Sequence, residues 1–464
     1  MPTKKIVRVL FLSVFSLVTP SFALASGTAA GEGHADTFPL VFLFLVGMLL
    51  FARIGALVER WRQPAVLGEL LMGVLLGTLA FAPGLHWIGP LKEDAFIKGI
   101  AEIGVILLLF RTGLESNVRE MMKVGVKAFI VACVGVALPF IGGYFLSKLL
   151  LPGHSFETYL FIGATLTATS VGITARVFKD LDVLKSIEAK IVLGAAVIDD
   201  VLGLLILAVV AGIISDGSVS AAGIGILTLK AIAFLVVSIG LGQVLAPHVG
   251  RWFSKIHTGV GMKMTIALVF CAVYAYGASA LAGLAPIVGA FAAGLVLDPV
   301  HFRAFSAPGI VGRIRAWVSR VADQGLVEEM HATAEQEHHA HVEKLIDGVS
   351  FFFVPIFFVY TGMHANLSAF ADLGTVGIAL AITAVAFLGK VLCGYAAGKG
   401  TNRLLVGFGM VPRGEVGLIF ANVGKQLGVV DDRTFAIVLI VVVLTTLLTP
   451  PILGSLIRKT SHRE

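Results

Sequence analysis

Two adjacent carboxylates, Asp199 and Asp200, lie in the middle of a span that is otherwise apolar and long enough to cross a bilayer. A carboxylate at the centre of a membrane helix costs roughly 2.5 to 3.5 kcal/mol on insertion scales, and intramembrane acids usually mark ion or proton paths. Neighbours on a helix are about 100° apart, so one acid can face a fixed internal cation and the other a mobile one. The alternative is a buried, hydrogen-bonded pair that only stabilises helix packing.

Lys390 is the only charged residue near the middle of another apolar span. A buried ammonium group needs a carboxylate or loses its proton, so Asp199 or Asp200 is its natural partner. A lysine that reaches the membrane interface from a misjudged span is the alternative.

The stretch from Gly163 to Thr174 is crowded with hydroxyl and small side chains at membrane depth. Such a stretch favours a broken helix, because unwound backbone is tolerated there only where it faces protein or a wet cavity, and its carbonyl groups can then bind ions. A continuous helix whose Ser and Thr side chains bond back to the preceding turn is the alternative.

A matching interruption is predicted in the second half of the chain, from Gly407 to Gly417, where Pro412 and four glycines interrupt the apolar sequence and Arg413 and Glu415 lie at the break. Paired interrupted helices point to an inverted repeat with its binding site at the membrane midplane. The two charged residues would neutralise the partial charges of the broken ends. They could instead form an ion pair that only stabilises the break.

These charged residues together carry one net negative charge, because the three acids Asp199, Asp200 and Glu415 exceed the two bases Lys390 and Arg413 by one. A bound monovalent cation or a proton would cancel it. The pattern therefore predicts that protons and cations compete for one site, which is the thermodynamic basis of exchange.

Composition places this chemistry in a polytopic, all-α membrane protein. The 464 residues are 57% hydrophobic and only 14% charged, with a mean hydropathy of +0.95; a soluble domain is far less apolar. The Lys and Arg residues that give the net charge of +6 lie in short loops, so they indicate the orientation of the chain in the membrane and not a nucleic-acid partner. Three cysteines within apolar spans predict no disulfide framework, and no cofactor is expected.

About thirteen spans of membrane length follow a predicted signal peptide at residues 1–25 and a predicted extracytoplasmic N-terminus at 26–37. An uncleaved first helix is the alternative to the signal peptide. The membrane domain has a first part at 38–297 and a second part at 348–457, separated by a His-rich polar loop at 298–347, with a short tail at 458–464. The predicted spans are 38–58, 64–82, 96–114, 124–148, 156–178, 187–213, 223–246, 262–282, 284–297, 348–363, 375–399, 404–427 and 434–457.

Lys and Arg concentrate in alternate loops, beginning with the loop at Glu59. The positive-inside rule then places the N-terminus outside, and the C-terminus and the loop 298–347 in the cytoplasm. The histidines of that loop lie among glutamates, which is typical of a solvated acidic helix; sensing of pH or binding of a metal is the alternative. They are His331, His338, His339 and His341.

In this order the motifs resemble the monovalent cation:proton antiporter-2 family, and within it the sodium/proton antiporters of the NapA type. The similarity runs from about Pro64 to Pro451. The motifs that carry it are Pro64-Ala-Val-Leu-Gly-Glu-Leu, Ala101-Glu-Ile-Gly-Val-Ile-Leu-Leu-Leu-Phe, Gly113-Leu-Glu115, Ala168-Thr-Ser-Val-Gly-Ile-Thr-Ala-Arg176, the Asp199-Asp200 helix, Lys390, and Pro412-Arg-Gly-Glu-Val-Gly417.

The resemblance implies a homodimer in which each chain has a dimerisation domain and a mobile core with two crossed broken helices, containing core helices within 124–213 and 375–457. It implies that Asp200 is the main ion-binding acid, that Asp199 pairs with Lys390 until protonation releases it, and that Thr167, Thr169 and Ser170 lie beside the ion. It also implies electrogenic exchange.

The function predicted is secondary active exchange of Na⁺, or of K⁺ or Li⁺, for protons by alternating access in pH and cation homeostasis, in a bacterial inner membrane. A K⁺/H⁺ antiporter or a K⁺ efflux protein of the same family is the alternative. Among other classes of protein, a cation channel is the alternative. An intramembrane aspartyl protease is disfavoured, because adjacent acids diverge around their helix and cannot converge on one water.

Overall fold

A computed structural model describes residues 38–61, 63–80, 85–115, 125–180, 183, 186–216, 221–297, 305, 341–365 and 372–461. The chain divides into two compact units, residues 1–46 and 47–464. Within the first unit, the described residues 38–46 form the beginning of helix α2 (Phe38–Gly55).

All the described regular structure is helical. The first half contains η1 (Ala56–Trp61), α3 (Ala65–Leu79), α4 (Ile88–Lys92), α5 (Ala95–Glu115), α7 (Gly125–Leu150), α8 (Phe156–Thr165), α9 (Val171–Asp180) and α10 (Ile187–Asp216). The remainder contains α11 (Ala221–Ser254), α12 (Val260–Ala282), α13 (Pro286–Val296), α16 (His341–Met363), α18 (Leu373–Cys393), η3 (Gly394–Ala397), α19 (Arg403–Gly409), α20 (Glu415–Gln426) and α21 (Asp432–Ser461).

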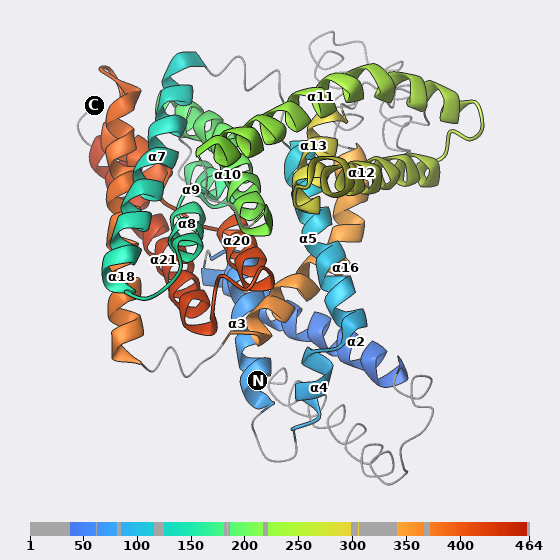
Figure 1. Ribbon diagram of the computed structural model, residues 1–464. Helices are drawn as coiled ribbons and strands as arrows, with labels where there is room; N and C mark the ends of the chain where they lie inside the picture. Colours follow the sequence, from blue (N-terminus) through green and yellow to red (C-terminus); the bar gives the residue numbers. More distant parts are fainter. Residues whose placement is uncertain are drawn as a thin grey trace, which may run out of the picture. The chain divides into compact units, whose positions relative to one another are not determined.

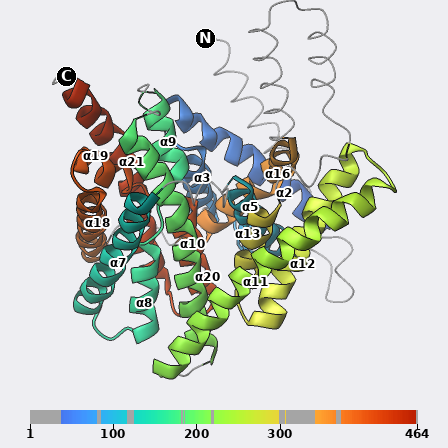
Figure 2. The same ribbon diagram turned by 90° about the horizontal axis from the view of Figure 1, so that it is seen from above.

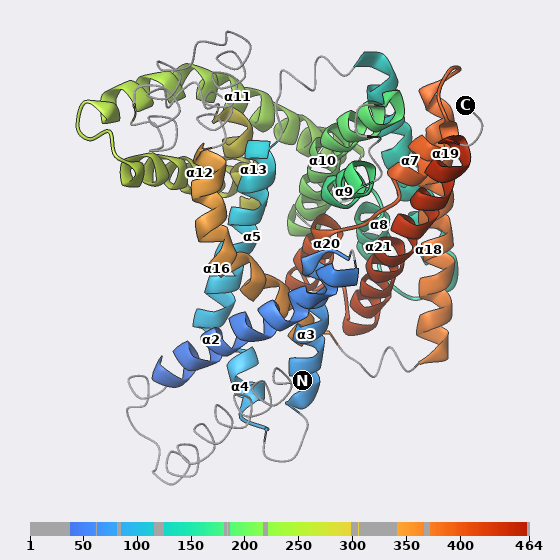
Figure 3. The same cartoon turned by 180° about the vertical axis from the view of Figure 1, so that it is seen from behind.

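Helices of the second unit pack in two groups. The first group, here called the α5 bundle, consists of α3, α5, α12, α13 and α16; α5 packs against both α13 and α16, and α16 also packs along α3 (Figure 3). The second group, here called the crossed bundle, consists of α7 to α10 and α18 to α21. In it α7 packs against α8, α10 and α18 (Figures 1 and 2). Helix α10 packs against α11, and α11 packs on α13, so α10 and α11 link the two groups.

The crossed bundle contains two interrupted helices, in each of which a short non-helical segment separates two half-helices. Helix α8 ends at Thr165 and α9 starts at Val171, while α19 ends at Gly409 and α20 starts at Glu415. Both leading half-helices have a side-chain N-cap: Ser155 accepts a hydrogen bond from the Thr158 amide, and Asn402 accepts one from the Leu405 amide. Such caps fix where a helix starts, so each half-helix is held at its outer end and stops at an interruption.

Eight of the described helices are long and apolar enough to cross a membrane, and shorter apolar helices accompany them. The prediction of an all-α polytopic membrane protein is therefore confirmed. The number of thirteen spans stays a prediction, because several of them correspond to shorter or interrupted helices. The signal segment 1–25 and the N-terminus 26–37 lie outside the described residues.

The polar loop predicted at 298–347 is shorter than expected at its C-terminal end. Helix α16 begins at His341 and not near Gly348. Its first turns combine buried Val342 and Ile346 with an Asp347 carboxylate 2.8 Å from the Arg111 guanidinium of α5. The charges that suggested a loop are thus on one side of a helix whose other side is apolar. His331, His338 and His339 lie outside the described residues.

Candidate functional site

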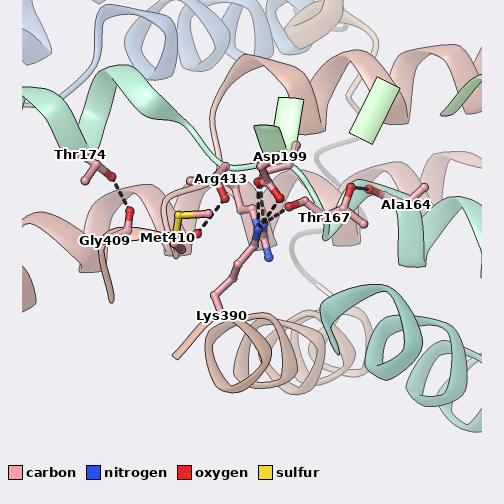
Figure 4. Close-up of polar contacts among 10 residues, drawn as sticks. Ala164, Thr167, Thr174, Asp199, Lys390, Gly409, Met410 and Arg413 are labelled. Carbon is pink, nitrogen blue, oxygen red and sulfur yellow. Dashed lines mark hydrogen bonds and ion pairs between the residues drawn. The ribbon is translucent and has the colours of Figure 1, made fainter. Parts of the chain in front are cut away.

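Lys390 of α18 and Asp199 of α10 form an ion pair inside the crossed bundle (Figure 4). The Lys390 Nζ atom donates to both carboxylate oxygens of Asp199, at 3.0 and 3.2 Å. Both side chains are fully buried. Removing one partner of such a pair typically costs 3–5 kcal/mol, because the other charge is left in a low-dielectric environment.

Small residues on α7 leave room for this pair. A Cβ atom on Gly135 would lie 3.6 Å from Lys390 Nζ and 3.2 Å from the Cys393 sulfur, and α7 packs against both α18 and α10. A larger side chain at this position would therefore press on the ammonium group. The glycine allows Lys390 to lie between helices and reach Asp199.

Arg413 lies in the interruption between α19 and α20 and reaches across to the other interruption. Its Nη1 atom donates to the carbonyl oxygens of Thr167, at 3.1 Å, and Ala168, at 2.5 Å. Its own carbonyl oxygen accepts a hydrogen bond from the Thr446 hydroxyl of α21. The side chain is 1% exposed, so this guanidinium satisfies backbone groups that water does not reach.

Hydroxyl groups from the α8–α9 region make the reciprocal contacts. Thr169 donates to the Met410 carbonyl at 2.9 Å, and Thr174 donates to the Gly409 carbonyl at 2.7 Å (Figure 4). The backbone amide of Ser170 also donates to the Pro412 carbonyl at 2.8 Å. Each interruption therefore supplies donors for the carbonyl groups that the other exposes.

The two interruptions approach closely where Gly414 meets Ser170. A Cβ atom on Gly414 would lie 2.7 Å from the Ser170 hydroxyl oxygen and 2.8 Å from its Cβ. Only glycine fits at this distance, which explains one of the glycines beside Pro412 in the sequence.

Asp200 is 5% exposed and follows Asp199 on α10. One turn further along the same helix, a Cβ atom on Gly203 would lie 3.5 Å from the Thr167 hydroxyl oxygen. Residues three and four apart share a helix face. The part of α10 that carries the acids therefore faces the end of α8, where Thr167 donates to the Ala164 carbonyl at 2.8 Å.

The structure thus brings together Asp199, Asp200, Lys390, Arg413 and the hydroxyl residues predicted from the sequence. Glu415 is the first residue of α20, but its side chain is not among those described. The described side chains carry two acids and two bases, so the predicted excess of one negative charge depends on Glu415.

Two further polar residues belong to this arrangement and were not singled out from the sequence. The sequence marks Thr174 only as the end of the hydroxyl-rich stretch, and it gives no prediction for Thr446. Thr446 is 3% exposed and forms part of a Thr-Thr pair at membrane depth. That pair of hydroxyls in an apolar span was a signal that could have identified it.

Such a site can bind and release a monovalent ion. Its available ligands are carboxylate, hydroxyl and carbonyl oxygens, which suit hard cations. Among the described residues no group of three or more His, Cys, Asp or Glu side chains could hold a metal ion. Acids and interrupted helices buried together in a helical membrane bundle define an ion transporter.

Comparison with known proteins agrees with that class. The family described as "Sodium/hydrogen exchanger, transmembrane" matches residues 10–314 and 325–459. The chain is 34% identical over 474 residues to the high-affinity Na⁺/H⁺ antiporter NhaS3 of Synechocystis sp., with 94% of each protein covered. It is 31% identical to the Na⁺/H⁺-K⁺ antiporter GerN of Bacillus cereus, with 89% of this chain and 95% of the relative covered.

The fold matches that of the sodium proton antiporter MjNhaP1 from Methanocaldococcus jannaschii, with a TM-score of 0.61, 16% identity, and 90% and 96% of the two chains covered. The chain belongs to the sodium/hydrogen exchanger family. The prediction of a cation/proton antiporter is confirmed, as is that of a transporter rather than an enzyme. The relatives do not favour a channel or an intramembrane protease.

Proposed function

We propose that the protein exchanges Na⁺ for protons by alternating access, with Asp200 as the main acid that binds either ion. The observation that carries this proposal is the fully buried Lys390–Asp199 pair at the crossing of two interrupted helices. Lys390 compensates the charge of Asp199, and Asp200 binds Na⁺ or a proton in turn. Thr167, Thr169 and Ser170 lie beside that ion.

Proton coupling involves the pair as well as Asp200. When Asp199 takes up a proton, its attraction for Lys390 falls and the ammonium group is released. Two protons, one at each acid, then exchange for one Na⁺, and one net charge moves per cycle. A membrane potential of 100 mV adds about 2.3 kcal/mol of driving force to such an electrogenic cycle.

The crossed bundle is the mobile core in this proposal, and the α5 bundle is the dimerisation domain of a homodimer. The ion pair and both interruptions are within the crossed bundle, so the site moves as one body. Arg413 and Glu415 compensate the charges of the broken helix ends. The protein acts in pH and cation homeostasis.

We place the protein in a cell membrane, in a bacterial inner membrane, with the N-terminus outside and the C-terminus in the cytoplasm. Removal of residues 1–25 produces the mature N-terminus. An uncleaved first helix is the alternative, and the family match, which begins at residue 10, extends into that segment. N-terminal sequencing of the purified protein decides between a start after residue 25 and an intact leader.

The test of function is a proteoliposome assay with an internal pH dye. Addition of Na⁺ changes the internal pH in wild type, and an imposed pH gradient drives Na⁺ uphill. Asp200→Ala abolishes both responses, whereas the control Glu102→Gln changes neither, because Glu102 is a half-exposed acid of α5. Unchanged responses of Asp200→Ala would remove Asp200 from the mechanism.

The same assay is repeated with Li⁺ and K⁺, since one relative is named as a Na⁺/H⁺-K⁺ antiporter.

Lys390→Gln weakens proton coupling more than cation binding, so that the pH dependence of transport flattens and charge movement falls. Wild-type pH dependence and charge movement in Lys390→Gln would make the proposed pairing untenable.

A further inference from the structure

Lys425, near the end of α20, links the crossed bundle to the α5 bundle. Its Nζ atom lies 2.6 Å from the Asp432 carboxylate of α21 and 5.2 Å from the centre of the Phe435 ring, both in the crossed bundle. The same ammonium group donates to the backbone carbonyl of His364 at 3.0 Å, just after the end of α16 in the α5 bundle. One side chain thus contacts both bundles.

The ring of His364 sits in a setting that responds to protonation. Its Nδ1 atom is 2.9 Å from the Tyr360 carbonyl oxygen, and its Nε2 atom is 3.5 Å from the Glu93 carboxylate. A neutral ring that donates from Nδ1 presents a lone pair at Nε2 to that carboxylate, whereas a protonated ring donates from both nitrogens. The side chain is 17% exposed, so water can deliver the proton.

Charges from three elements surround this ring. They are Lys92 of α4 with the adjacent Glu93, and Lys425 of α20, which is paired with Asp432 of α21. Burial lowers the pKa of His364 below its ordinary value; Lys92 and Lys425 act in the same direction, and the Tyr360 carbonyl and Glu93 oppose them. The ring is therefore neutral near pH 7, and gaining a proton places a positive charge beside the Lys425 ammonium.

We propose that Lys425 and His364 form a pH-sensitive clasp that holds the crossed bundle against the α5 bundle and weakens when His364 is protonated. The clasp rests on the proposed alternating access, because it stabilises one arrangement of the two bundles. Acid conditions favour its release and alkaline conditions favour its closure.

The chain offers variants that separate the two partners. His364→Gln keeps the backbone carbonyl that accepts from Lys425 but carries no proton to titrate. Lys425→Met keeps the length of the side chain and its packing on Phe435 but cannot donate. His154→Gln is the matched control, since His154 lies 3.5 Å from Asp431 and joins two parts of the crossed bundle only.

The experiment measures the distance between spin labels at Phe96 and Leu373, in full-length protein whose three native cysteines are replaced. Phe96 is 47% exposed at the start of α5, and Leu373 is 87% exposed at the start of α18, so each label reports on one bundle. Distance distributions are recorded between pH 5 and pH 8.5, alongside transport by the same variants.

In wild type and His154→Gln we expect the population of the clasped distance to rise with pH, by about threefold to tenfold, as for a charge-assisted hydrogen bond that is partly exposed. His364→Gln stays clasped at every pH, and Lys425→Met loses the clasped population at every pH. A His364→Gln distribution that follows pH as wild type does overturns the clasp, as does an unchanged Lys425→Met distribution. If the wild-type protein transports Na⁺ but either of these two distance results is found, the exchange mechanism stands and only the clasp is wrong.

Discussion

The two helix interruptions satisfy the same backbone requirement with different chemistry. At the end of α8, the carbonyl groups of Thr167 and Ala168 accept hydrogen bonds from the Arg413 guanidinium. At the end of α19, the carbonyl groups of Gly409 and Met410 accept from the neutral hydroxyls of Thr174 and Thr169. The C-terminus of a helix carries a partial negative charge. The α8 end is therefore compensated by a full positive charge, whereas the α19 end is not.

This difference bears on the electrostatics of the ion site. Lys390 and Arg413 already place two positive charges near Asp199. A third cation at the α19 end would oppose the binding of a mobile cation, whereas hydroxyls satisfy the carbonyl groups without adding charge. Arg413→Met and Thr174→Val test whether charge and hydroxyl contribute unequally in this way, Gly414→Ala tests the close approach of the two interruptions, and His364→Gln provides a reference outside both.

The largest effect is expected for Arg413→Met. It leaves two buried carbonyl groups without a donor and removes the compensating charge of α8. We expect a loss of about 3 kcal/mol or more in the free energy of unfolding, measured by denaturation of the detergent-solubilised protein. Arg413→Lys keeps the charge but not the planar group, so its free energy of unfolding falls between those of wild type and Arg413→Met. Wild-type stability of Arg413→Met would contradict a compensating role.

A smaller effect is expected for Gly414→Ala, which pushes the two interruptions apart. The added methyl group meets Ser170, whose amide is held by the Pro412 carbonyl. Overpacking of this kind costs about 1–3 kcal/mol. Gly454→Ala is the control, since a Cβ atom there has nothing within 4 Å. Equal stability of the two alanine variants would mean that the close approach does not matter.

Thr174→Val tests the hydroxyl at the α19 end, with nearly unchanged shape. The Gly409 carbonyl loses its donor, which costs about 1–2 kcal/mol, less than Arg413→Met because no charge is involved. Thr174→Ser restores the hydroxyl and with it most of the stability. If Thr174→Val is as damaging as Arg413→Met, the distinction between charge and hydroxyl fails.

His364 provides the pH reference for these measurements, because it lies outside both interruptions. Burial lowers its pKa in the folded protein. The stability it contributes is therefore fully present above the pKa of the unfolded chain and is lost as the pH falls through the folded pKa. We expect His364→Gln to remove this acid-induced loss, the smallest of the four effects. Identical acid sensitivity in wild type and variant would exclude His364 as its source.

The sequence predicted the interruptions and the acids because local signals specify them. Proline, glycines and hydroxyls mark unwound backbone, and a charged residue in an apolar span stands out by its cost. It did not predict that Arg413 donates to the carbonyl of Ala168, 245 positions away, or that the Thr446 hydroxyl donates to the Arg413 carbonyl. Such pairings depend on how helices pack, which no local pattern encodes. The start of α16 was misplaced for the same reason, since Arg111 of another helix accommodates Asp347.

The most direct measurement is the apparent KM for Na⁺ as a function of pH, in proteoliposomes of the wild-type protein. If protonation of Asp200 and binding of Na⁺ at Asp200 exclude each other, KM rises about tenfold for each unit by which the pH falls below the pKa of the site, while the maximal rate at saturating Na⁺ is preserved. A KM that does not change across the acidic range, in a protein that still exchanges Na⁺ for protons, would contradict competition for one site.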